Sequence, residues 1–148
     1  MNLEELVAAF RARTLTHAEW THAAHLAVGA WFVHHEGAVG ALARLREEIP
    51  RLNDRHGTAN SATSGYHQTI TAAFVRLLDE GLASFAPEVP LERRIAALRA
   101  GPLGDSRVLL SFWSRDLLMS PRARAEWVEP DLKELRLGGA AKQADPIH

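Results

Sequence analysis

Apolar residues recur three or four positions apart along most of the chain, which is the spacing of one face of a helix. Leu3, Val7 and Phe10 follow this spacing near the start, and the clearest stripe lies within residues 66–83. No run of alternating β-branched residues indicates a strand. The pattern predicts helices over residues 3–13, 22–37, 39–55, 66–83, 91–100, 106–119 and 121–127.

Residues at the ends of these segments support the boundaries. Thr21 is a typical N-cap residue for the segment that follows it, and Gly57 is typical of the position just after a helix C-terminus. Thr16 and Glu19 have the spacing of a capping box. Pro50 is expected to kink or divide its helix, unless it opens a new segment.

The composition indicates a globular chain, because 47% of its 148 residues are hydrophobic and 24% are charged. This length is sufficient for one domain to close a core. Short predicted linkers favour an all-α fold, an up-and-down helical bundle with additional short C-terminal helices, over residues 1–137. Residues 138–148 are expected to be a disordered tail.

Charge and cysteine content exclude several classes of function. The chain has no cysteine, which excludes disulfides, thiolate metal sites and cysteine nucleophiles. Its formal net charge is -1, from 17 basic and 18 acidic residues, so we expect no nucleic-acid partner and no membrane partner. Neither a signal peptide nor a membrane-spanning apolar run is evident, and the expected location is cytoplasmic. The expected partner is a small-molecule substrate, and a homo-oligomer is left open.

Histidine is distributed unevenly along the chain. Seven of the eight histidines lie within the first 67 residues: His17, His22, His25, His34, His35, His56 and His67. If the three helices between residues 22 and 83 run up, down and up, three of their ends meet at one end of the bundle. His22 and His25 lie at the first of these ends, His56 at the second and His67 at the third. Topology therefore predicts that four histidines gather in one place.

The residue types at that end of the bundle point to a metal centre. His22 and His25 are three positions apart and so share a helix face, while His67 heads the inward stripe of its helix. A helix N-terminus disfavours a charged imidazole, and neutral imidazole binds zinc, iron, copper or nickel. We therefore predict His22, His25 and His67 as metal ligands. His56 is predicted to move a proton and Tyr66 to hydrogen-bond the substrate.

Other interpretations of these residues stay open. The histidines could be core or capping side chains, which is the commoner role of a lone residue such as His67. The carboxylates of Glu19 and Asp54 could complete an iron site of two histidines and one carboxylate. Arg124 and Trp127 either close over an anion or stack on each other at the surface.

Four segments together resemble a family of short, all-helical bacterial proteins to which no activity has been assigned. They are residues 20–26 (WTHAAHL), 53–57 (NDRHG), 64–71 (SGYHQTIT) and 124–132 (RAEWVEPDL). The resemblance spans about residues 16–135 and implies that the WTHxAHL and GYHxTxT motifs belong together. Pro50 and Leu52 depart from the family pattern, so it does not define the shape of their helix. A looser similarity to DinB-type bundles implies a three-histidine metal site at one end.

These observations predict a metal-dependent enzyme that acts on a small polar molecule through a three-histidine site. Three ligands leave one coordination position for substrate, whereas a structural metal usually has a closed shell. Hydrolysis, elimination, isomerisation and oxygen-dependent chemistry all fit such a divalent transition metal, and the sequence does not distinguish zinc, iron, copper or nickel. The alternative is a non-catalytic metal- or ligand-binding helical bundle with structural histidines.

Overall fold

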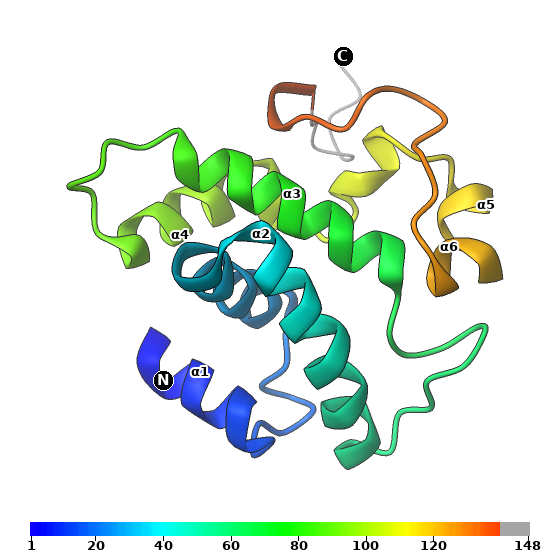
Figure 1. The fold of residues 1–148 in the computed structure, drawn as a ribbon, viewed down its shortest axis with the longest axis horizontal. Coiled ribbons are helices and arrows are strands. Elements are labelled where there is room, and N and C mark those ends of the chain that lie inside the picture. Colours follow the sequence, from blue (N-terminus) through cyan, green and yellow to red (C-terminus); the bar gives the residue numbers. More distant parts are fainter. Residues whose placement is uncertain (140–148) are drawn as a thin grey trace.

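The computed structural model describes residues 1–139, which form helices and 3₁₀ turns without a strand (Figure 1). The α-helices are α1 (Leu3–Ala12), α2 (His22–Arg55), α3 (Gln68–Ala83), α4 (Leu91–Ala100), α5 (Arg115–Leu118) and α6 (Pro121–Ala125). The 3₁₀ turns are η1 (Pro102–Gly104), η2 (Val108–Ser111) and η3 (Leu137–Gly139). The predicted all-α helical bundle is confirmed. Most of the predicted tail, residues 140–148, lies outside the described residues.

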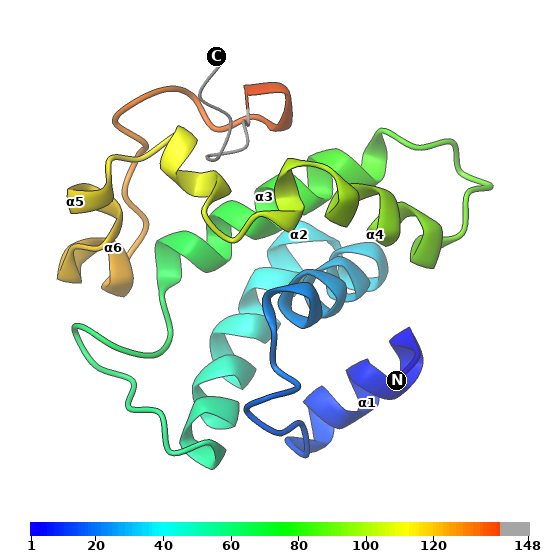
Figure 2. The same ribbon diagram turned by 180° about the vertical axis from the view of Figure 1, so that it is seen from behind.

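α2 contains both of the helices predicted between residues 22 and 55. Its non-helical residue is Gly37, at φ 77° and ψ 170°, a left-handed region that favours glycine. Beyond this bend the second half of α2 continues in a different direction from the first half (Figures 1 and 2). Pro50 does not divide the helix, because the second half of α2 continues through it. Proline removes one backbone hydrogen bond, and the buried Leu45 and Leu52 hold the helix against the core on either side.

Two other predicted boundaries differ for local reasons. α3 begins at Gln68 and not at residue 66, because His67 has an extended backbone and caps the helix. The helix expected over residues 106–119 is wrong as one element, since it divides into η2 and α5. Trp113 is fully buried between them, and Ser114 then caps α5 by accepting a hydrogen bond from the backbone of Leu117.

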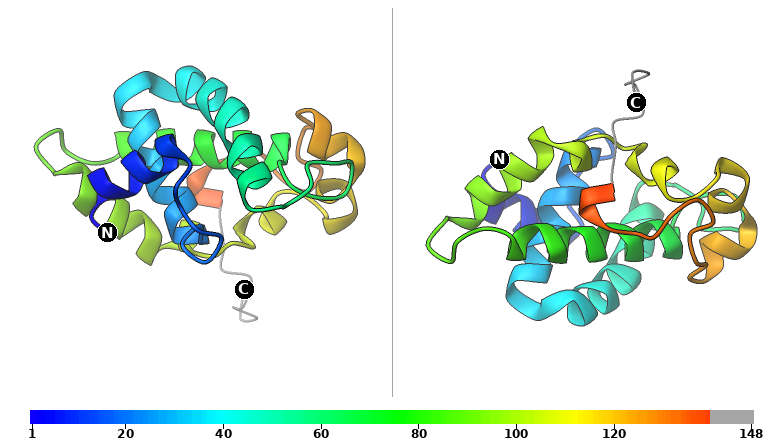
Figure 3. Two further views of the ribbon diagram at one scale, coloured as in Figure 1. Left: turned by 90° about the horizontal axis from the view of Figure 1, so that it is seen from below. Right: turned by 90° about the horizontal axis from the view of Figure 1, so that it is seen from above.

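The core forms where α3 crosses both halves of α2, as the views in Figure 3 show. The largest fully buried side chains are Phe10, Phe32, Leu52, Leu77, Phe112 and Trp113. At Gly29 the two helices approach so closely that an added Cβ would lie 3.0 Å from Cδ1 of Leu78. A larger residue here would displace the end of the Leu78 side chain, so the close approach of the two helices favours glycine.

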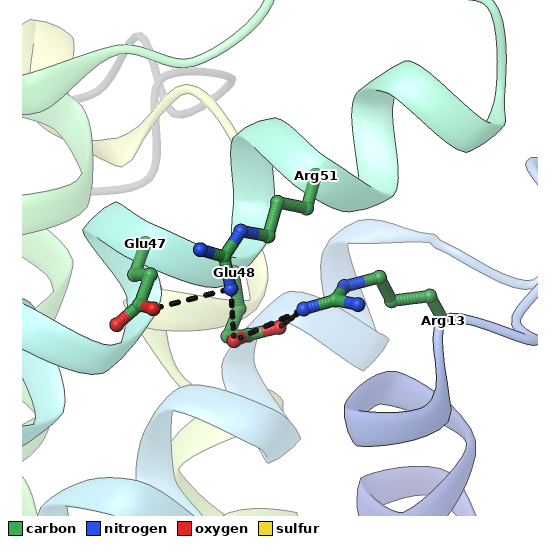
Figure 4. A network of polar contacts seen from close by, with 4 residues as sticks. All are labelled: Arg13, Glu47, Glu48 and Arg51. Carbon is green, nitrogen blue, oxygen red and sulfur yellow. Dashed lines mark hydrogen bonds and ion pairs between the residues drawn. The ribbon is translucent and has the colours of Figure 1, made fainter.

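A polar network fixes the end of α1 on the second half of α2 (Figure 4). Nη2 of Arg13 lies 3.1 Å from Oε2 of Glu48. Nη1 of Arg51 lies 3.1 Å from Glu47 and 3.4 Å from Glu48. The network anchors the start of the loop that leads to α2, and this loop contributes side chains to the site described below.

Side-chain hydrogen bonds attach the C-terminal segment to the N-terminal end of α3, beside which α5 and α6 lie (Figures 1 and 2). The buried hydroxyl of Thr69 donates to the carbonyl of Glu126 at 2.8 Å and accepts from the backbone N–H of Val128 at 3.2 Å. Nε1 of Trp113 donates to the carbonyl of Val128 at 3.1 Å. Residues of the GYHxTxT motif and of the segment 124–132 therefore hold α3 and the C-terminal segment together.

Among residues 1–139, no helix is both long and apolar enough to cross a lipid bilayer.

Candidate functional site

Two adjoining cavities lie where α2, α3 and their flanking loops meet. The polar cavity, of about 430 Å³, is lined by His17, Trp20, His25, Ile49, Asn53, His56, Thr58, Gly65, Tyr66, His67, Ile70, Thr71 and Arg124. The apolar cavity, of about 300 Å³, is lined by Trp20, His22, His25, Leu26, Gly29, Leu45, Ile49, Ile70, Thr71, Phe74, Val75, Leu78 and Ser106. The shared residues make them one cleft, with His25 at the junction.

The cleft brings together the three predicted metal ligands and the two predicted catalytic residues. His25, His56, His67 and Tyr66 line the polar cavity, and His22 lines the apolar cavity. The polar cavity also includes His17, for which no role was predicted from the sequence. His17 lies in the loop before α2, so helical spacing could not predict that its side chain faces the cavity.

His25 is held with one ring nitrogen turned away from its neighbours. Its Nδ1–H donates to the carbonyl of Thr21 at 2.7 Å, and its ring stacks on Trp20 with centroids 3.7 Å apart. The ring is open on its cleft side but crowded by protein elsewhere. Desolvation lowers its pKa to about 4, with a smaller contribution from the nearby His22. His25 is therefore neutral at pH 7, and the lone pair of its Nε2 has no partner among the described residues.

His67 uses both ring nitrogens to hold the fold. Its Nδ1 accepts a hydrogen bond from the backbone N–H of Ile70 at 3.1 Å, and its Nε2–H donates to the carbonyl of Leu118 at 2.7 Å. This pair of bonds requires the neutral Nε2–H tautomer. Burial, followed by the positive charge of Arg124, lowers the pKa of His67. The ring thus caps α3 and fastens the C-terminal segment at once.

His56 and His22 each have one nitrogen committed to the backbone. Nε2 of His56 donates to the carbonyl of Leu15 at 2.7 Å, and its buried Nδ1 has no hydrogen-bond partner. The ring of His17 meets that of His56 edge to face, with centroids 5.6 Å apart. Nε2 of His22 donates to the carbonyl of Leu103 at 2.8 Å.

These hydrogen bonds determine which ring nitrogens of the predicted metal ligands remain available. Nδ1 of His22 and Nε2 of His25 are available as donors to a metal, whereas His67 would have to release one of its two bonds. Over residues 1–139 no three histidine, aspartate or glutamate side chains are grouped so that they could hold a metal ion. The three-histidine metal centre therefore stays a hypothesis.

The carboxylates considered as alternative ligands have other roles. Glu19 accepts from the backbone N–H of Thr16 at 2.9 Å, as the predicted capping box requires, and these hydrogen bonds lower its pKa. Asp54 accepts a hydrogen bond from Asn60 at 3.2 Å. Neither carboxylate lines the polar or the apolar cavity.

Tyr66 and Arg124 form the wall of the polar cavity next to the loop before α3. The hydroxyl of Tyr66 donates to Oε1 of Gln68 at 2.7 Å, and burial raises its pKa. Nη1 of Arg124 donates to the carbonyl of Gly65 at 2.7 Å. Trp127 lies elsewhere, with the guanidinium of Arg76 3.9 Å from its ring centroid. Of the predicted C-terminal pair, Arg124 reaches the cleft and Trp127 does not.

The electrostatic character of the cleft is positive. The described lining includes one permanent cation, Arg124, and no aspartate or glutamate. The histidines add lone pairs and N–H groups without permanent charge. Such a lining accommodates a negatively charged or strongly polar group in the polar cavity and an apolar group in the apolar cavity.

Comparison with known proteins found no matching protein family, no similar curated protein and no similar solved structure.

Proposed function

We propose that the protein is an enzyme that moves a proton on a small molecule bound in the cleft, with His25 as the proton acceptor. The supporting observation is the state of the His25 ring. Thr21 fixes its tautomer, Trp20 fixes its plane, and Nε2 remains without a partner at the junction of the two cavities. Elimination and isomerisation, two of the predicted reaction types, need such a base and a site that orients the substrate.

Two neighbouring residues have the chemistry to assist this step. His56 lies in the wall of the polar cavity, and its Nδ1 has no hydrogen-bond partner. The Tyr66 hydroxyl is held by Gln68, and its raised pKa keeps it protonated and able to donate. His56 is thus suited to relay a proton, and Tyr66 to hydrogen-bond an oxygen of the substrate.

Nitrobenzisoxazole is a suitable probe of this function because its reaction needs only a base. When the base removes the proton from the ring carbon, the C–H electron pair forms a nitrile and the N–O bond breaks. The released electron pair remains on oxygen, which gives a coloured cyanophenolate. The rate of colour formation therefore reports proton abstraction in the cleft.

The wild-type protein should accelerate this reaction, and His25→Gln should reduce the acceleration by on the order of tenfold or more. Its rate should stay level from neutral pH downward and fall to half near pH 4, where His25 becomes protonated. His34→Gln is the matched control, because His34 lies outside both cavities. Equal rates in wild type and His25→Gln would overturn the proposal.

A metal-dependent enzyme with His22, His25 and His67 as ligands is a second candidate. It is supported by the unpartnered Nδ1 of His22 and Nε2 of His25, which belong to residues three positions apart on one helix. A metal at one hundred times its dissociation constant would stabilise the fold by roughly 2.7 kcal/mol. That gain raises the melting temperature by about 2–4 °C per kcal/mol. His67→Ala should abolish this metal-dependent increment and His34→Ala should keep it, whereas equal increments would exclude His67 as a ligand.

A further inference from the structure

Arg124 is the permanently charged side chain in the described lining of the cleft, and it has no counter-ion there. No described carboxylate pairs with it, although it is partly buried in the wall of the polar cavity. Its Nη1 donates to the carbonyl of Gly65 at 2.7 Å and to that of Tyr66 at 3.5 Å, whereas its buried Nε has no hydrogen-bond partner. A guanidinium that is partly removed from water is stabilised by an anion, and a carboxylate matches its planar geometry.

The apolar cavity indicates which chemical group the ligand needs besides a negative charge. Its walls include Leu26, Leu45, Phe74, Val75 and Leu78, and it opens into the polar cavity past His25. Burial of apolar surface stabilises a complex. A ligand that reaches from Arg124 past His25 into this cavity therefore needs a charged head and an apolar body.

We propose that the cleft binds an amphipathic carboxylate, with the carboxylate on Arg124 and the apolar body in the apolar cavity. This inference rests on the proposed function, because it names the substrate class for the same site. Binding in this direction brings the middle of the ligand to Nε2 of His25.

A second groove on the other side of Arg124 must be distinguished from this site. That groove is lined by Arg46, Arg122 and Arg124 together with Tyr66. Arg122 lies in the groove but outside the cleft, and it pairs with Glu126 at 3.1 Å. Arg122→Gln is therefore a matched control that removes a nearby positive charge without touching the cleft.

Titration calorimetry with octanoate, octanol and acetate tests the inference on the whole chain. Octanoate should bind at least tenfold more tightly than octanol, which lacks the charge, and than acetate, which lacks the apolar body. Arg124→Gln should weaken octanoate binding at least tenfold, and Arg122→Gln by less than twofold. Arg124→Lys keeps the positive charge and should bind with intermediate affinity, which provides the test if Arg124→Gln fails to fold.

The outcomes separate this inference from the proposed function. His25→Gln should still bind octanoate, because the base is not needed for binding. No binding of octanoate, equal binding of octanol, or equal loss in the Arg122 and Arg124 variants would overturn the inference. Turnover of nitrobenzisoxazole would be unaffected by such a result, since that probe carries no carboxylate.

Discussion

Replacement of His67 by alanine should destabilise the fold by an amount that the structure allows us to work out. The variant loses the N-cap acceptor for Ile70, which is worth roughly 1 kcal/mol. It also leaves the carbonyl of Leu118 without its donor in a buried position, at a cost of about 1–3 kcal/mol. The sum is roughly 2–4 kcal/mol of unfolding free energy. In a domain of this size the melting temperature should fall by about 5–15 °C.

His67→Asn separates the two contributions, because asparagine is a good N-cap but its shorter side chain does not reach Leu118. Urea denaturation should show that His67→Asn recovers about 1 kcal/mol of the loss caused by His67→Ala, with an unchanged m-value. The exposed His34→Ala should change stability by less than about 0.5 kcal/mol. If His67→Ala stays within 0.5 kcal/mol of wild type, or is no less stable than His67→Asn, the double role assigned to His67 is refuted.

Three further predictions concern stability and can be measured by the same denaturation experiments. Arg94→Met should lose about 3 kcal/mol or more, because the guanidinium donates to the carbonyls of the loop before α4 from a buried position, whereas Arg93→Met should be nearly neutral. Gly65→Ala should lower the unfolding free energy more than Gly57→Ala does. Both glycines have positive φ, but an added Cβ at residue 65 would lie 2.5 Å from the nearest backbone oxygen, whereas at residue 57 it would meet nothing within 4 Å. Equal losses of unfolding free energy would contradict this explanation. The lowered pKa of His25 means that, as pH falls, the unfolded chain binds a proton at this residue before the folded chain does. The unfolding free energy should therefore decrease as pH falls from about 6.5 towards 4. His25→Gln should flatten this dependence, and an unchanged slope would show that His25 is not desolvated.

The sequence predicted the helices and the gathering of histidines because both depend on local spacing and chain order. His25, His56 and His67 line one cavity, as expected from the ends of the helices on which they lie. These histidines meet even though the two predicted helices are joined through a bend at Gly37 and not by a separate loop. Topology determines which ends meet, and it is insensitive to the exact angle between neighbouring helices.

The use made of each ring nitrogen could not be predicted, because it depends on carbonyl groups from distant parts of the chain. His67 donates to Leu118, which is 51 residues away, and His22 donates to Leu103, which is 81 residues away. Neither partner leaves a signal in the sequence, since every residue has a backbone carbonyl. The loop position of His17 and the exposure of Arg124 to the cleft depend on the same long-range packing.

Nitrogen-15 nuclear magnetic resonance of the histidine rings tests the central claim most directly, because it reports tautomer and protonation for each ring. We predict that His25 is the neutral Nδ1–H tautomer, becomes protonated only near pH 4, and has no hydrogen bond at Nε2. His67 should be the Nε2–H tautomer with a hydrogen-bonded Nδ1. A His25 ring that titrates near its ordinary value of 6.5, or that carries its proton on Nε2, would contradict the claim that His25 is the available base of the cleft.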